Sequence, residues 1–250
     1  MAAWYVIFRL EVLPPVLVPS PVVVLRTLGE WIGGAAGTRG NFYAGRAPGD
    51  VAASVTRIAI GFSVGSALAI LAGILVGWSE RVARYVDPLI QVLRPIPRTA
   101  FLPFALLLFG LSQTSAIVLI AYGSFIASYV QVLSGVRLVG RDLKRAAYML
   151  GASDATILRR VVFPAALPYI FGGLRVGIAY AWALLLLAEM FATKSGIGYT
   201  LWRSFEFMRM DVLLATLVML GLCGAATDRL IVLTSRRVLD WAQDIAETRL

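Results

Sequence analysis

RDLKRAAYMLGASDATILRRVVFPAALP, residues 141–168, is a basic segment that lies between two long apolar runs. Within twenty residues it holds five cations: Arg141, Lys144, Arg145, Arg159 and Arg160. Lys and Arg are enriched in the cytoplasmic loops next to membrane spans. The segment is therefore predicted to be a cytoplasmic loop that joins two spans.

The pattern inside this loop predicts two short helices separated by a break. The apolar residues of the first helix recur at the spacing of one helical face: Leu143, Ala146, Ala147 and Leu150. We expect Gly151 to end this helix and Ser153 to cap a second one that begins at Asp154. A loop needs an apolar helical face only if it packs against protein, so we predict a docking surface. The alternative is a solvated amphipathic hairpin.

This loop resembles the EAA loop of ABC-transporter permease subunits of the binding-protein-dependent type I family. Arg145, Ala146 and Ala147 stand at the E-A-A positions, Gly151 stands at the family's glycine, and residues 163–168 match the proline-rich start of the next span. Arg145 replaces the family's Glu, so a polar contact of that Glu is not carried over. The likeness extends over nearly the whole chain and is greatest to permeases of alkanesulfonate, taurine and nitrate importers.

The resemblance implies an all-α integral membrane protein with the type I importer fold, five to six transmembrane helices and a cytoplasmic coupling loop at residues 137–164. It implies a homodimer in the bacterial inner membrane, two ATP-binding subunits that hold ATP and Mg²⁺, and an extracytoplasmic substrate-binding protein. The chain itself would bind no cofactor and catalyse no reaction. The residues expected to couple it to the ATPase are Leu143, Arg145, Ala146, Ala147, Leu150, Gly151, Ala152 and Ser153.

Composition independently indicates a membrane protein. Of the 250 residues, 59% are hydrophobic and only 15% are charged, and the mean hydropathy is +0.81. A soluble domain carries about 25% charged residues. The chain has no His and a single Cys, Cys223, and it lacks a P-loop or metal-ligand spacing, so we expect neither metal nor nucleotide binding. The net charge of +9 is explained by span-flanking cations facing lipid headgroups rather than by nucleic acid.

Five membrane spans are predicted from runs with few charges. Four are continuous: 58–78, 112–136, 165–188 and 212–234. The fifth, 88–111, contains Pro95, Pro97 and Pro103, so we expect a broken helix.

The remaining segments are assigned by polarity. Residues 1–17 are either a reduced first span or part of a full span whose beginning is missing because the start of the chain is placed too late. Residues 18–57 are an outer segment with a short amphipathic helix at 22–32 and a glycine-rich connector. Residues 58–234 are the permease core, and 235–250 form a tail that the positive-inside rule places in the cytoplasm.

Three arginines are candidates for an anion pathway. Arg175 lies near the middle of its span, where it would either line the path or bridge to a carbonyl or to Asp228. Arg94 and Arg98 are four residues apart, as on one helical face, and snorkelling to headgroups is favoured over a pathway role.

Glu189 ends the same span as Arg175 at the outer side. Its predicted role is structural: the carboxylate would accept backbone N–H groups of the following loop, which contains Ser195, Gly196 and Gly198. The family resemblance implies that this loop contributes to an outer gate.

Two other functions are alternatives to this interpretation. The first is import of a neutral heterocycle such as a vitamin precursor, since related permeases serve such substrates. The second is a secondary transporter that works without ATP, which predicts inverted repeats or ionisable relays within spans. No repeat is visible in the sequence.

Overall fold

The computed structural model describes residues 19–34 and 42–240, and this part of the chain contains helices and no strand. Segments 1–18, 35–41 and 241–250 lie outside the described residues. The predicted first span at 1–17 and most of the predicted tail at 235–250 therefore remain untested.

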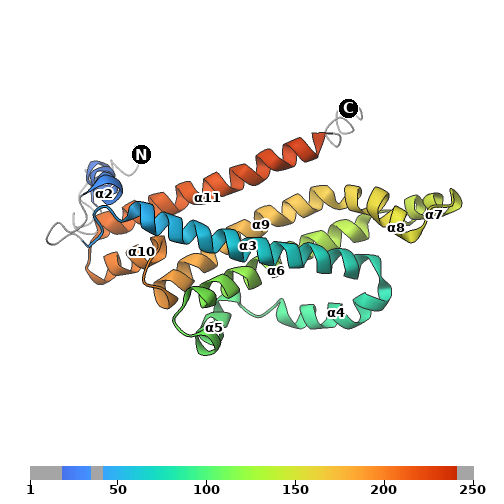
Figure 1. Cartoon of the computed structure of the whole chain (residues 1–250), viewed down its shortest axis with the longest axis horizontal. Coiled ribbons are helices and arrows are strands. Elements are labelled where there is room, and N and C mark those ends of the chain that lie inside the picture. The colour runs from blue at the N-terminus through green and yellow to red at the C-terminus, as the bar shows by residue number, and fades with distance from the viewer. Residues whose placement is uncertain (1–18, 35–41, 241–250) are drawn as a thin grey trace.

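Three long helices form the centre of the molecule: α3 (Ala47–Trp78), α6 (Gln113–Leu138) and α9 (Phe163–Ala192). They run alongside one another through the elongated bundle in Figure 1. α3 meets α6 along small residues spaced four apart, Gly61, Gly65, Ala69, Gly73 and Gly77. A Cβ added at any of the four glycines in this row would clash with α6. Small residues of this kind let membrane helices approach closely, which explains why α3 and α6 pack along most of their length.

The other helices surround this centre. α11 (Met210–Val238) lies along one side of the bundle, whereas α2 (Pro21–Gly33) and α10 (Ile197–Glu206) gather at one end. At the opposite end are α7 (Arg141–Met149), α8 (Asp154–Ile157) and the π-helical turn η2 (Leu158–Val162), which leads into α9 (Figure 1).

The predicted broken span is confirmed. α4 (Glu80–Leu93) is followed by the 3₁₀ turn η1 (Arg98–Ala100) and α5 (Phe101–Phe109), and the chain bends by 85° at the break. Pro95 and Pro97 fall in the break, where their missing N–H groups and fixed φ prevent a continuous helix. Among the described residues, four single helices are long and apolar enough to cross a membrane, and the bent pair makes up to five.

The boundary predicted between residues 57 and 58 is wrong. α3 begins at Ala47, so the last eleven residues assigned to the outer segment are the first three turns of a spanning helix. Pro48 in the first turn and Asp50, an acidic residue at the helix N-terminus, favour this start. The charged Arg57 does not end the spanning helix, because its side chain is buried and paired within the bundle.

The amphipathic helix predicted at 22–32 is α2, and Ser20 caps it. Its buried face includes Val24, Thr27 and Trp31, and this face packs on protein. The Thr27 hydroxyl donates to Asp211 of α11 at 3.0 Å.

Candidate functional site

The loop at 141–168 has the helix–break–helix form that the sequence predicts. Gly151 has a φ of +77°, the left-handed conformation that glycine adopts without strain. The Ala152 amide donates to the Ala147 carbonyl at 3.1 Å and the Gly151 amide donates to the Tyr148 carbonyl at 2.9 Å. These two bonds form a Schellman motif, which satisfies the last carbonyls of α7. Ser153 then caps α8 by accepting from the Thr156 amide.

One side of this loop is fixed to the bundle. Ile157 and Val162 are fully buried in an apolar cluster with residues of α6 and α9, and Ala147 and Ala152 pack against it. Lys144 places its ammonium over the Trp78 ring at the end of α3, 5.3 Å from the ring centroid. The loop is therefore a rigid extension of the long helices.

The other side of α7 is apolar and exposed. Leu143 is 59% exposed, Met149 89% and Leu150 88%, and Ala146 is also exposed beside them. The predicted apolar face is thus divided: Ala147 faces the bundle, and Met149 joins the outward face in its place. Large apolar side chains that are exposed together in this way mark a surface on which a partner binds.

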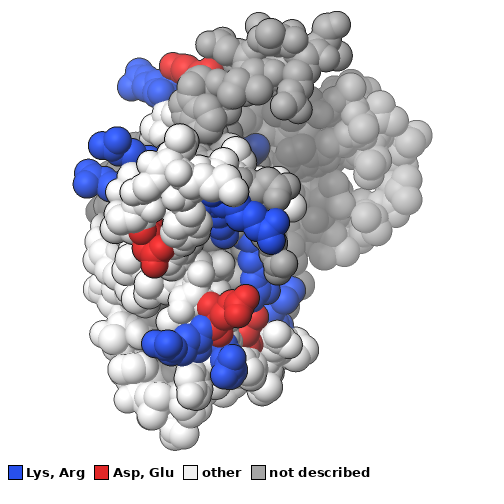
Figure 2. Space-filling view, turned by 90° about the vertical axis from the view of Figure 1, so that its right-hand side faces the viewer, with Lys and Arg blue, Asp and Glu red and all other residues white. Residues whose placement is uncertain are grey.

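The surface at this end is charged. Figure 2, which looks onto it, shows mainly Lys and Arg side chains among uncharged residues, with fewer Asp and Glu. Tyr148 donates to Asp154 across the break at 2.7 Å, and this hydrogen bond raises the pKa of the Tyr148 hydroxyl. The bond also ties α7 to α8.

A buried ion pair lies at the opposite end of the bundle. Arg57 of α3 donates through Nη1 to Glu189 of α9 at 2.6 Å, and both side chains are at most 1% exposed. Glu189 also accepts from the Ser54 hydroxyl at 2.8 Å and from the Gly198 amide at 2.9 Å. Glu189 thus accepts a backbone N–H of the loop after α9, the contact that the sequence predicts, and its structural role stays a prediction.

A second carboxylate holds the same loop. Asp50 accepts from the Gly196 amide at 3.1 Å and from the Thr200 hydroxyl at 2.8 Å. Gly196 has a φ of +120°, and a Cβ there would collide with the Glu189 carboxylate. A glycine is thus required at this position both by conformation and by space.

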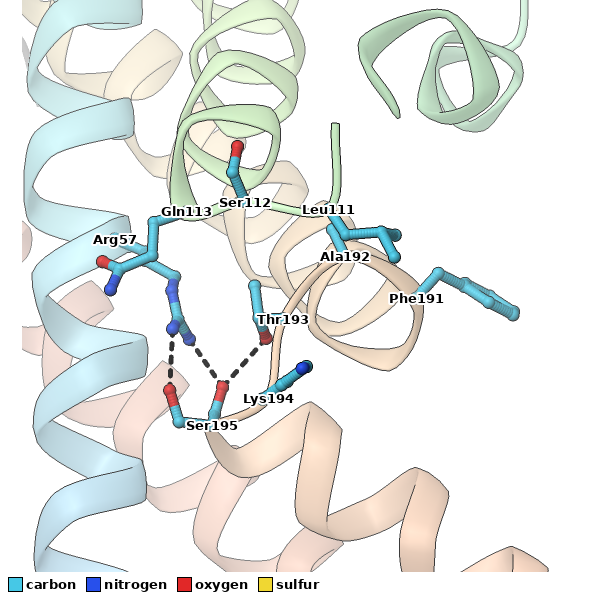
Figure 3. A pocket seen from close by; sticks show the side chains of 9 residues that line it. All are labelled: Arg57, Leu111, Ser112, Gln113, Phe191, Ala192, Thr193, Lys194 and Ser195. Atoms are coloured by element: carbon cyan, nitrogen blue, oxygen red, sulfur yellow. Dashed lines mark hydrogen bonds between the residues drawn. The ribbon is translucent and has the colours of Figure 1, made fainter. Parts of the chain in front are cut away.

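A pocket of about 400 Å³ opens beside this cluster. In Figure 3, Arg57 reaches from α3 toward Ser195, to which it donates through Nη1 at the carbonyl and through Nη2 at the hydroxyl. Lys194, Thr193 and Gln113 also line the pocket. The predicted gate residues Glu189, Ser195, Gly196 and Gly198 thus meet at one place, together with Arg57.

Arg175 forms a bridge. Its Nε and Nη2 donate to the two carboxylate oxygens of Asp228 at 2.9 and 3.1 Å, which joins α9 to α11. This is one of the two roles left open by the sequence. A role in an anion pathway stays a prediction.

Arg94 and Arg98 do not share a helical face, so that expectation is wrong. α4 ends at Leu93, and Arg98 begins η1 after the proline break. Both nevertheless line one pocket between α6 and α9, where the Arg98 guanidinium lies 3.9 Å from the centroid of the Tyr180 ring. The Arg98 side chain therefore packs inward on α9 instead of extending toward an end of the bundle.

Residues 65–240 match the family described as binding-protein-dependent transport system inner membrane component. This range includes the α7–α8 loop, all of α9 and all of α11.

The chain belongs to this family.

Curated relatives of this permease support the family assignment. The putative aliphatic sulfonates transport permease protein SsuC of Bacillus subtilis (strain 168) is 33% identical over 96% of this chain and 84% of its own length. The taurine transport system permease protein TauC of Escherichia coli (strain K12) is 33% identical over 98% and 87%. The nitrate import permease protein NrtB of Synechocystis sp. (strain ATCC 27184 / PCC 6803 / Kazusa) is 35% identical over 72% and 65%. The recognition of a sulfonate-, taurine- and nitrate-type ABC permease from sequence is confirmed.

Several residues of these clusters in the permease carry no role in the sequence-based predictions. Asp50, Ser54 and Arg57 lie before the matched range, in a segment taken as a connector, and only their spacing at i, i+4 and i+7 could have indicated one polar helical face. Tyr180 gave no signal, because an aromatic residue within an apolar span is ordinary.

Proposed function

We propose that this permease is the membrane-spanning subunit of an ATP-driven importer of a small anion. Two copies would enclose the path, two ATP-binding subunits would dock on the α7–α8 loops, and an extracytoplasmic binding protein would deliver the substrate. ATP and Mg²⁺ would be held by the ATP-binding subunits, and this chain would catalyse no reaction.

The observation that supports docking is the apolar outward face of α7, formed by Leu143, Ala146, Met149 and Leu150. Exposed large apolar side chains at the basic end of a membrane protein favour a protein partner over lipid, because this end carries the charges expected at a cytoplasmic surface. The loop is fixed to α6 and α9 through Ile157 and Val162. Movement of a docked ATPase would therefore move these helices as rigid levers.

The substrate class is supported by the relatives. Permeases named for sulfonates, taurine and nitrate share substrates that contain a small oxyanion group. A small anion is consequently the substrate that we expect here.

The docking proposal is tested by placing a charge on the outward face of α7. Ala146→Asp and Leu150→Asp should insert in the membrane but lose co-purification with the ATP-binding subunit, because the apolar face would have to bury a carboxylate. Met208→Asp is the matched control: Met208 is 56% exposed at the other end of the molecule, and its φ of 54° is tolerated by Asp. Retention of the whole complex in pull-downs of both α7 variants would contradict the proposal.

A further inference from the structure

The pocket between the α4–α5 break and helices α6 and α9 contains two arginines and lies at mid-height in the bundle. Tyr180 and Val176 come from the middle third of α9, and Ile126 comes from the middle third of α6. Arg94 and Arg98 line it from the break, and Gln131 adds an amide. Its volume is about 270 Å³.

In the part of the chain that the structure describes, no carboxylate compensates the positive charge of this pocket. No Asp or Glu lines it, and in residues 19–34 and 42–240 neither Arg94 nor Arg98 makes an ion pair. Arg98 Nε is buried and has no hydrogen-bond partner among the described residues. The carboxylate on the neighbouring α4, Asp87, is already occupied by Arg137 at 2.6 Å and by the Tyr129 hydroxyl at 3.2 Å.

The arginines of the three central helices α3, α6 and α9 differ in this respect. Arg57 is paired with Glu189, Arg175 with Asp228, and Arg137 with Asp87. An arginine at mid-height in a membrane protein normally faces a partner or a water-filled cavity. The pair formed by Arg94 and Arg98 faces a cavity, and an anion in that cavity would supply the missing negative charge.

We infer that this pocket binds the oxyanion group of the transported substrate, with Arg98 as its main ligand; this inference rests on the proposed function. The Tyr180 ring lies against the guanidinium and fixes its plane, so that the fork of N–H donors is presented in one orientation. Arg94 adds a second positive charge, and the Gln131 amide adds neutral donors.

The walls of the pocket narrow the substrate class. Ile126 and Val176 are aliphatic, so one side of the cavity suits a short hydrocarbon group while the arginines hold the charged end. A cavity of about 270 Å³ has room for nitrate or a short alkanesulfonate. A lipid phosphate has the same oxyanion chemistry and is the competing source of the anion.

Binding is measured on the purified full-length permease in dodecyl maltoside, a detergent without phosphate. The probes are nitrate, ethanesulfonate and, in a separate titration, short-chain phosphatidylglycerol. Saturable binding of nitrate or ethanesulfonate is expected, and Arg98→Gln should weaken it at least tenfold. Arg98→Lys should retain part of it, because a point charge replaces the planar fork poorly. The matched control is Arg84→Gln, an exposed arginine of α4 outside the pocket, which should leave binding unchanged.

Tyr180 has its own pair of variants, since it acts as a positioning residue. Tyr180→Phe keeps the ring and should bind normally, whereas Tyr180→Leu should weaken binding without changing the melting temperature. Equal affinities for all variants, no binding of either small anion, or Arg98-dependent binding of phosphatidylglycerol alone would each overturn the inference.

Uptake by the reconstituted complex separates this inference from the proposed function. If the wild-type complex imports neither anion, the proposed function fails, whatever the binding assay shows. If it imports an anion and Arg98→Gln does so equally fast, the proposed function stands and the pocket is not on the substrate path.

Discussion

At the scale of single residues, the buried Arg57–Glu189 pair ties α3 to α9 at the end of the bundle that carries α2 and α10. Both charges are removed from water, and Glu189 accepts from Ser54 and Gly198 in addition to Arg57. Removing one partner of a buried pair leaves an unpaired charge and costs about 3–5 kcal/mol, whereas an apolar replacement of both partners is often neutral.

We therefore predict that Glu189→Gln lowers the free energy of unfolding by about 3 kcal/mol or more. The double variant Arg57→Met/Glu189→Leu should recover most of this loss. The control is the half-exposed pair Arg203–Glu206, where Glu206→Gln should change stability by no more than about 0.5 kcal/mol. Thermal unfolding in detergent measures all three. A Glu189→Gln variant as stable as wild type would show that the pair contributes little to stability.

The Arg175–Asp228 bridge leads to a second prediction at this scale. Arg175→Ala and Asp228→Ala each leave one charge unpaired within a spanning helix, so both should lower the yield of folded protein to a similar degree. The exchange Arg175→Asp/Asp228→Arg should restore it. Yield is measured by fluorescence-detected gel filtration, and uptake by the complex is measured alongside. Loss of uptake in Arg175→Ala alone, with normal yield in all variants, would instead favour a role in the anion path.

At the scale of elements, the α7–α8 loop was predictable because its signals are local. Gly151, Ser153 and the apolar spacing of α7 act over a few residues. The structure reproduces the break at Gly151 and the cap at Ser153, whereas it divides the predicted apolar face of α7 between the bundle and the outside. The Arg57–Glu189 contact was not predictable, because the partners are 132 residues apart and no local pattern joins them. Arg94 and Arg98 were assigned to one helical face although two prolines lie in that interval. Because these prolines have no backbone N–H to donate, the helix ends before them and the two arginines fall on different elements.

The break between α7 and α8 can be tested through the conformation of Gly151. Nothing lies within 4 Å of a Cβ added there, so only the positive φ disfavours other residues. Gly151→Asn should preserve the loop, because Asn tolerates the left-handed region, whereas Gly151→Val should cost about 1–2 kcal/mol of local stability. We expect co-purification with the ATP-binding subunit to be retained in the first variant and reduced in the second. Equal recovery of the complex from both variants would mean that docking tolerates a different loop geometry.

At the scale of the whole molecule, the two ends of the bundle differ in chemistry. One end carries the α7–α8 loop with its cations and exposed apolar side chains, and the other carries α2, α10 and the Arg57–Glu189 cluster (Figure 1). Along α11, only Val212, Ala215 and Thr216 are buried, so most of this apolar helix is left for lipid or for a second copy of the chain. The positive-inside rule predicts that the α7–α8 end lies in the cytoplasm.

This orientation leads to the last prediction, which uses the single cysteine of the chain. Cys223 is partly buried and is first replaced by Ser to give a cysteine-free background. Leu150→Cys and Met208→Cys then place one exposed thiol at each end, at side chains that are 88% and 56% exposed. In intact spheroplasts, a membrane-impermeant maleimide should label Met208→Cys and leave Leu150→Cys unlabelled. In inside-out vesicles the result should be reversed, because a charged reagent does not cross the hydrocarbon core. Labelling of Leu150→Cys in spheroplasts would place the docking loop outside the cell, where no ATP-binding subunit could reach it, and would contradict the proposed function as well as the orientation.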